Sequence, residues 1–210
     1  MSTTNPELPR LIAGKAEFKA PGSSIAQGIL RMAGWTLRYE GLPAGQGVIM
    51  VYPHTSNWDF ILGVLVKWAF GIQARWWGKD SLFMIPLLGP WARGIGGIPV
   101  DRANASGLVG NTADQMKAAR ANRELFWLAV APEGTRSLVS GWRSGSYHVA
   151  VQAQAPVGLA YFDFATKTVG LTDFVELSGD PDKDFALFAK VLAPYRGKRP
   201  ELAGPVKLRT

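Results

Sequence analysis

The sequence has 210 residues, of which 47% are hydrophobic and 19% charged, so a disordered chain is excluded and one domain is expected. It contains no cysteine, which excludes disulfides, thiolate metal sites and a cysteine nucleophile. The net charge of +7 favours an anionic partner, such as an anionic membrane surface or a phosphorylated substrate. We expect no nucleic-acid partner, because the basic residues are scattered and no aromatic nucleic-acid motif occurs.

Residues 1–22 are polar and contain prolines, which predicts a flexible N-terminal arm ahead of a single domain at 23–210. We expect neither a signal peptide nor a membrane-spanning helix, since no apolar run is long enough for either. A helix is predicted from Ser23 or Ser24, with Ile25, Ile29 and Met32 recurring on one face. That face can pack on the core or lie on a bilayer surface, and core packing is the preferred interpretation.

The middle of the chain alternates predicted strands and helices. Strands are expected at 36–40, 48–52 and 74–78, with a helix from Trp58 to about Phe70 between the second and third. Two prolines and a glycine predict a broken helix over 81–93. A very short strand at 98–100 precedes a helix that carries Leu108, Thr112, Met116 and Ala119.

The predicted strand at 124–131 is apolar on both faces, which is typical of a central parallel strand covered by helices. After it we expect a helix at 145–153, a buried strand at 156–162, and a late antiparallel pair at 168–171 and 174–177. A final amphipathic helix carries Phe185, Phe188, Ala189 and Leu192. This order predicts an α/β fold, with a mostly parallel central sheet flanked by helices.

His54 and Asp59 lie where an apolar strand gives way to a helical pattern, which is where α/β sheets place their chemistry. Histidine is the default general base near neutral pH, and a carboxylate on its second ring nitrogen would orient it. The two side chains can meet if His54 stays in the loop while Asp59 occupies the first helical turn. The alternative is that Ser56 to Asp59 merely cap the helix.

Three further motifs follow in order. Lys79 opens the pattern Lys-x-x-Leu-x-x-x-Pro-x-x-Gly, the stretch 97–102 ends in Arg102, and Glu133-Gly134-Thr135-Arg136 follows the central strand. A weaker one, Ala155-Pro156-Val157-Gly158, comes last.

These blocks, taken together with His54 and Asp59 and in this order, resemble the glycerolipid acyltransferase family typified by lysophosphatidic acid acyltransferase. The resemblance covers about residues 54–160. It departs from the family at Pro53, where an asparagine is usual, and at Pro99, where a bulky apolar residue is usual.

The resemblance implies a role for each matched residue. His54 would deprotonate the acceptor hydroxyl, and Asp59 would orient His54. Arg102, Arg136 and Lys79 would hold the acceptor phosphate, while Glu133 with Gly134 and Thr135 would shape the acceptor pocket. Pro156 would belong to the acyl-donor side. Backbone amides near Ser56 and Asn57 are candidate donors to an oxyanion.

The implied protein is a membrane-peripheral O-acyltransferase on the cytoplasmic face of the inner membrane. It would move a fatty acyl chain from acyl-CoA or acyl carrier protein to a lysolipid acceptor, without a cofactor or a metal. Three alternatives stay open: a hydrolase with the same dyad, acylation of a non-glycerol lysolipid, and a non-catalytic lipid-binding module. His148 is interpreted as a packing histidine, and Arg75, Arg143, Lys198 and Arg199 as surface charges.

Overall fold

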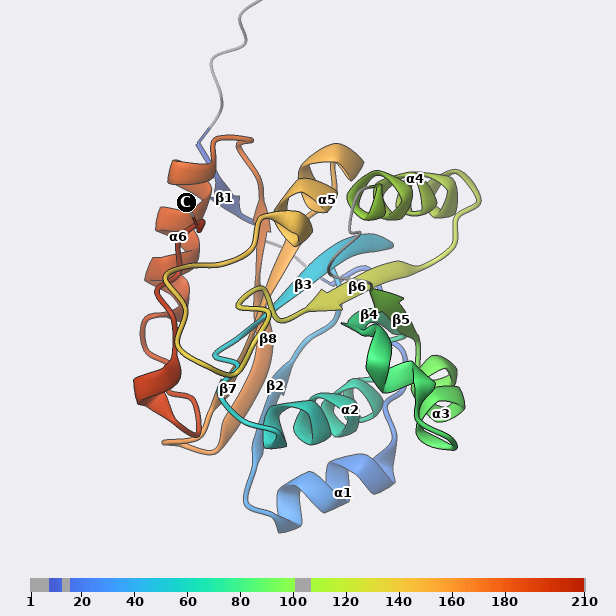
Figure 1. Cartoon of the computed structure of the whole chain (residues 1–210), viewed down its shortest axis with the longest axis vertical. Coiled ribbons are helices and arrows are strands. Elements are labelled where there is room, and N and C mark those ends of the chain that lie inside the picture. The colour runs from blue at the N-terminus through green and yellow to red at the C-terminus, as the bar shows by residue number, and fades with distance from the viewer. Residues whose placement is uncertain (1–7, 13–15, 101–106, 210) are drawn as a thin grey trace, which may run out of the picture.

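The computed structural model describes residues 8–12, 16–100 and 107–209. Within these ranges the chain forms an eight-stranded sheet in the order β1-β8-β7-β3-β6-β4-β5, with β2 also paired to β8 (Figure 1). The strands are β1 (Arg10–Leu11), β2 (Thr36–Tyr39), β3 (Gln46–Tyr52), β4 (Ala74–Lys79), β5 (Gly97–Val100), β6 (Phe126–Val130), β7 (Val157–Asp163) and β8 (Thr168–Glu176).

The five strands β7, β3, β6, β4 and β5 run parallel to one another, and β8 runs antiparallel to β7. The predicted α/β fold with a mostly parallel sheet is therefore confirmed. The apolar strand β6 lies between β3 and β4 near the middle of the sheet, as its two-sided apolar pattern predicts.

Helices cover both faces of the sheet (Figure 1). On one face, α1 (Ser24–Met32) packs against α2 (Trp58–Phe70), and their core includes Leu30, Leu62 and Trp127. On the other, α4 (Leu108–Ala121), α5 (Gly145–Ala153) and α6 (Pro181–Leu192) share a second core. The 3-10 helix η1 (Asp80–Met84) and α3 (Leu88–Gly94) lie beside β4 and β5, so the broken helix predicted over 81–93 is confirmed. A short η2 (Pro200–Leu202) follows α6.

The preferred interpretation of α1, with its repeating apolar face in the core, is wrong. Ile25 and Met32 are 76% and 84% exposed, and Ile29 is also exposed. The buried residues of α1 are Ala26 and Leu30, because the helix is rotated so that this smaller stripe faces the core. The larger apolar face of α1 therefore points away from the protein.

The expected antiparallel pair at 168–171 and 174–177 is also wrong, because both segments belong to the single strand β8. Leu159 of β7 pairs with Asp173, whereas the next residue, Ala160, pairs with Leu171. Thr172 is thus an extra residue on β8, and the strand carries a β-bulge there. The polar Thr172-Asp173 interruption that suggested a turn marks this bulge instead.

The first described residues are attached to the sheet. Arg10 pairs with Glu176 at the start of the short strand β1, and Phe18 forms an antiparallel bridge with Leu42. The division of the chain at residue 22 stays a prediction. Among the described residues, none of the helices has the length and apolar character needed to span a bilayer.

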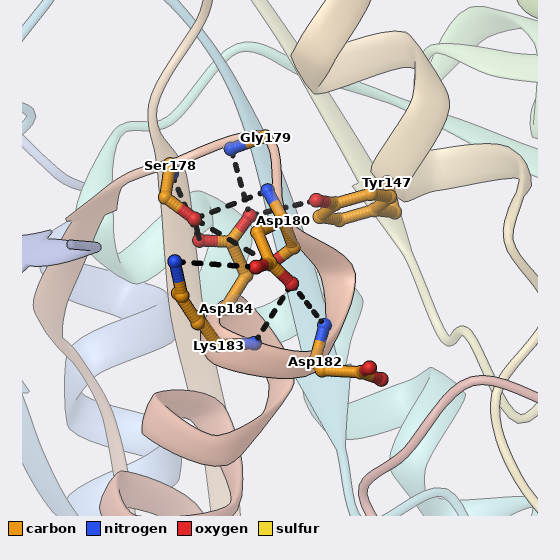
Figure 2. A network of polar contacts seen from close by, with 7 residues as sticks. All are labelled: Tyr147, Ser178, Gly179, Asp180, Asp182, Lys183 and Asp184. Carbon is orange, nitrogen blue, oxygen red and sulfur yellow. Dashed lines mark hydrogen bonds and ion pairs between the residues drawn. The ribbon is translucent and has the colours of Figure 1, made fainter. Parts of the chain in front are cut away.

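Besides the N-cap residue Asp180, the buried carboxylate of Asp184 fixes the start of α6 (Figure 2). It accepts hydrogen bonds from the Tyr147 hydroxyl at 2.7 Å, from the Ser178 amide and hydroxyl at 2.9 and 2.8 Å, and from the Gly179 amide at 3.3 Å. Burial, followed by the contact with Asp184, raises the pKa of the Tyr147 phenol. This network ties α6 to α5 and so positions the chain that follows α6.

Candidate functional site

The candidate site lies at the carboxyl ends of β3 and β6, which are neighbours in the sheet. After β3 the chain passes through a cis Tyr52–Pro53 peptide bond and a short loop that carries His54, and then enters α2. After β6 it reaches Glu133. Because parallel strands end at the same edge of a sheet, residues 79 positions apart in the sequence come together here.

His54 and Asp59 meet in the way that their spacing allows, with His54 in the loop and Asp59 in the first turn of α2. The Nδ1 atom of His54 lies 3.3 Å from Oδ2 of Asp59, the histidine side chain being 20% exposed and the aspartate 1%. The same Oδ2 accepts hydrogen bonds from the backbone amides of Thr55 at 2.7 Å and Ser56 at 2.8 Å. Asp59 therefore holds the loop around His54 as well as the ring itself.

This arrangement changes the expected oxyanion donors. The amide of Ser56 is directed at Asp59, so it is not free to stabilise an oxyanion as the sequence suggested. The Ser56 hydroxyl accepts a hydrogen bond from the Trp58 amide at 3.1 Å, so Ser56 contributes to the start of α2.

Glu133 is 2% exposed, and both of its carboxylate oxygens accept hydrogen bonds from backbone amides. Oε2 accepts from His54 at 2.6 Å and Oε1 from Gly204 at 2.8 Å. Burial raises the pKa of the Glu133 carboxyl above its ordinary value, and the two amides oppose that shift. Glu133 thus links the His54 loop to the C-terminal segment.

The segment after α6 wraps around the site. The Arg199 amide donates to the Thr55 hydroxyl at 3.2 Å, and the Tyr52 hydroxyl donates to the Gly204 carbonyl at 3.1 Å. The Lys198 ammonium lies 4.7 Å from the centre of the Trp58 ring, in cation–π contact. Residues near the end of the chain therefore complete a site whose histidine comes from its first third.

An apolar cavity of about 230 Å³ runs from His54 between α2 and the sheet to β8. Its walls include Phe60 and Gly63 from α2, Ile49 from β3, and Phe162 and Leu171 from β7 and β8. The side chain of Lys67 also lines this cavity. It donates a hydrogen bond to the Ile95 carbonyl, and burial lowers its pKa. Such a cavity suits an apolar chain.

A second, more polar cavity of about 530 Å³ also reaches His54. It is lined by Gly134, by the turn before α5 and the first residues of that helix, and by Arg209. Trp77, Val130 and Ala131 line both cavities, as does His54. His54 therefore lies where an apolar and a polar cavity meet.

The structure places the remaining predicted residues with different outcomes. Gly134 lines the polar cavity, whereas the exposed Lys79, Thr135 and Arg136 line neither cavity. The Thr135 hydroxyl accepts from the Ser137 amide at 3.4 Å. Arg102 lies outside the described residues.

Two arginines in the polar cavity were not recognised as site residues from the sequence. Arg143 is exposed, as its interpretation as a surface charge predicts, but it also lines the cavity, and the motifs do not include Arg209. Neither arginine lies in one of the motifs. The sequence offers one signal for Arg143, which is that it follows Glu133 by only ten positions. The interpretation of His148 as a packing residue is wrong, because its side chain is exposed while its neighbours Tyr147 and Val149 are buried.

A comparison with family models gives the same family as the motifs. The family model described as Acyltransferase matches residues 36–158, which is more than half of the chain. The crystal structure of the 1-acyl-sn-glycerophosphate (LPA) acyltransferase PlsC from Thermotoga maritima is similar, with a TM-score of 0.54 and 17% identity. It covers 80% of this chain and 74% of that one. A comparison with curated proteins found no significant match.

Proposed function

Because the chain belongs to the acyltransferase family and is an acyltransferase enzyme, we propose that it transfers a fatty acyl chain from a thioester to the free hydroxyl of a lysophospholipid. The acceptor would be a molecule such as 1-acylglycerol-3-phosphate, the substrate for which the structurally similar PlsC is named. Acyl-CoA or acyl carrier protein would be the donor. The observation that carries the proposal is the place of His54 between an apolar and a polar cavity.

The proposed reaction needs one proton carrier and no cofactor. With Nδ1 of His54 beside Asp59, the other ring nitrogen takes the proton of the acceptor hydroxyl. The acceptor oxygen attacks the thioester carbonyl and forms a tetrahedral intermediate, which collapses and breaks the carbon–sulfur bond. The leaving thiolate then takes the proton back from His54. Asp59 stabilises the imidazolium during these steps.

The two cavities supply the two kinds of binding that this reaction requires. The acyl chain lies in the apolar cavity along α2, with its thioester near His54. The polar cavity receives the phosphate-bearing part of a substrate. Lys79, Arg102, Thr135 and Arg136 remain proposed contacts of the acceptor headgroup where it extends beyond the polar cavity. Glu133 holds the loop on which His54 lies.

Lysolipids partition into bilayers, so we place the enzyme peripherally on an anionic membrane, at the cytoplasmic face of the inner membrane. Exposed apolar side chains on neighbouring elements support this location. They are Ile25, Ile29 and Met32 on α1, Trp58, Ile61 and Trp68 on α2, and Met84, Ile85, Leu87 and Trp91 around α3. The positive net charge adds attraction to anionic lipids.

The test is release of free CoA thiol from palmitoyl-CoA, with and without lysophosphatidic acid, for wild type and His54→Ala. Acceptor-dependent release that is lost in the variant supports the transferase. Thiol release at the same rate with and without the acceptor would instead support a hydrolase with the same dyad. If neither protein releases thiol, acyl carrier protein donors and other lysolipids are tested, and inactivity with all of them would refute the proposal.

A further inference from the structure

The polar cavity is lined by two exposed arginines, Arg143 and Arg209, which lie on neighbouring backbone segments. The Trp142 amide donates to the Lys207 carbonyl at 2.7 Å, and the Arg209 amide donates to the Trp142 carbonyl at 2.9 Å. These bonds form a parallel bridge between Trp142 and Leu208, so the next residues in register are Arg143 and Arg209. Both arginines line the cavity that reaches His54.

No carboxylate among the described residues pairs with either guanidinium. The ion pairs found among the described residues involve other basic groups, namely Arg10, His54, Lys117 and Lys183. The nearest acidic residue in the sequence, Glu133, directs both oxygens at backbone amides instead. Two exposed positive charges therefore line the cavity without a carboxylate partner among the described residues.

The N-terminal end of α5 opens into the same cavity. Ser144, Gly145 and Ser146 line it, the cap at Ser144 makes no side-chain hydrogen bond, and the first turn has no acidic residue. Amides in a first helical turn have no partner within the helix and favour anions. Ser146 is 2% exposed, and its hydroxyl has no hydrogen-bond partner among the described residues. A buried hydroxyl without a partner is costly, and a bound ligand would relieve that cost.

Gly134 makes room for this cluster. Its φ angle is +69°, and a Cβ atom built on it would lie 2.8 Å from Nε of Arg143. A larger residue at this position would be strained and would push the guanidinium away. The glycine of the Glu133–Arg136 motif thus allows Arg143 to lie against the turn that follows β6.

We propose that Arg143, Arg209 and the N-terminal end of α5 form a phosphate-binding subsite that orients a phosphate-bearing substrate next to His54. The proposal rests on the acyl transfer proposed above and assigns the phosphate to residues outside the sequence motifs. Paired guanidinium groups bind phosphate oxygens by charge-assisted hydrogen bonds, and the helix amides and Ser146 hydroxyl complete the shell. The phosphate belongs either to the acceptor headgroup or to the carrier of the thioester.

Binding measured without acyl transfer tests the subsite directly. We would titrate glycerol 3-phosphate, and separately adenosine 3′,5′-bisphosphate, into wild type and the double variant Arg143→Gln/Arg209→Gln by calorimetry. The double variant is expected to bind one of the two probes about tenfold more weakly or worse. Arg38→Gln is the matched control, because Arg38 is exposed on β2 and lines neither cavity. Equal binding of both probes by wild type and double variant, or no binding to wild type, would overturn the proposal.

Kinetics then identify which substrate carries the phosphate. A raised KM for lysophosphatidic acid but not for monoacylglycerol assigns it to the acceptor. A raised KM for palmitoyl-CoA but not for the palmitoyl thioester of N-acetylcysteamine assigns it to the donor. Unchanged KM values for all four would count against the subsite. Arginine-sensitive binding of a probe in a protein without transferase activity would refute the proposed function and leave the subsite standing.

The double variant must first be shown to fold, by its circular dichroism and melting temperature. If it does not fold, Arg143→Lys/Arg209→Lys replaces it, since lysine keeps the charge but loses the bidentate geometry. This variant is expected to bind the probe more weakly than wild type. Unchanged binding would contradict the proposed guanidinium contacts.

Discussion

Oε2 of Glu133 lies 2.6 Å from the backbone nitrogen of His54 and accepts its hydrogen bond. The other oxygen of the same carboxylate accepts from Gly204, so one buried side chain at the end of β6 fixes two loops at once. A site built in this way depends on an acceptor with two equivalent oxygens. Replacing one of these two oxygens is therefore expected to destabilise the protein.

Glu133→Gln is expected to lower the free energy of unfolding by about 1–3 kcal/mol. Both amide donors need an oxygen, and a glutamine would present its NH2 group to one of them. Chemical denaturation measures the loss. Glu40→Gln, at an exposed position directly after β2, is the control and should change stability by less than about 0.5 kcal/mol.

The same variant has an expected pH dependence. The pKa of Glu133 is raised above its ordinary value of 4.5 in the folded protein, so the folded state binds this proton more tightly than the unfolded state. The contribution of Glu133 to stability is then largest below pH 4.5 and falls as pH rises through the folded pKa. The difference in the free energy of unfolding between wild type and Glu133→Gln should therefore become smaller as pH rises from 4.5 through the folded pKa of Glu133. A difference that grows with pH would contradict the stated direction of the pKa shift.

Two substitutions of Asp59 separate its charge from its hydrogen bonds. In Asp59→Asn the remaining oxygen can still accept from Thr55 and Ser56, so we expect a near-normal melting temperature. The activity should nevertheless fall about 100-fold or more, because the imidazolium of His54 loses its counter-charge. Asp59→Ala should reduce both stability and activity. An active Asp59→Asn enzyme would favour the interpretation of Asp59 as a helix cap alone.

The length of acyl chain should depend on Gly63, which lines the apolar cavity from α2. A Cβ atom there would have only Phe162 near it, at 3.8 Å, so Gly63→Leu can be accommodated by filling the cavity. We expect kcat/KM to fall about tenfold or more for palmitoyl thioesters and to change little for short ones. Gly28→Leu on α1, where a Cβ meets no atom within 4 Å, is the control. An equal loss for all chain lengths would argue against this path for the acyl chain.

The network at the start of α6 predicts a stability effect away from the site (Figure 2). Asp184→Ala would leave the Tyr147 hydroxyl and the donors of Ser178 and Gly179 without their acceptor. We expect a loss of about 2–4 kcal/mol in the free energy of unfolding. Asp182→Ala, two residues away and exposed, should be within about 0.5 kcal/mol of wild type. Similar stabilities of the two variants would show that the network contributes little.

Membrane binding should depend on the exposed apolar faces of α1 and α3. Met32→Asp and Leu87→Asp remove apolar side chains that are 84% and 89% exposed, so neither is expected to change the melting temperature. Each should weaken flotation with vesicles that contain phosphatidylglycerol by severalfold, because apolar burial and attraction to anionic lipids are both reduced. The exposed Thr36→Asp adds the same charge on β2 and serves as the control. Flotation unaffected by all three variants would contradict the proposed docking face.

Much of the fold follows from local pattern. The two-sided apolar run at β6 and the loop between β3 and α2 are set by neighbouring residues, and both were predicted. The bulge at Thr172 could not be read in this way, because only pairing with β7 reveals that the strand continues. The rotation of α1 was missed for a related reason: Ala26 and Leu30 are buried because of what they face on α2.

In the site, too, contacts between residues close in sequence could be predicted, whereas contacts between distant segments could not. The meeting of His54 and Asp59 is local, since five residues and one helical turn determine it. Arg143 and Arg209 come together only through the bridge between Trp142 and Leu208, which joins segments 66 residues apart. Motifs mark groups whose spacing is fixed along the chain, and this pair has no such spacing.

The bond between Gly204 and Glu133 has a consequence for exchanging parts between enzymes. The region matched by the family model ends at residue 158, whereas the donor to Oε1 comes from residue 204. A chimera that imports only 36–158 would bring Glu133 without that donor and Arg143 without Arg209. Transplanting the specificity of this enzyme therefore requires residues 196–209, after α6, to be transferred together with the motifs, as a second and discontinuous module.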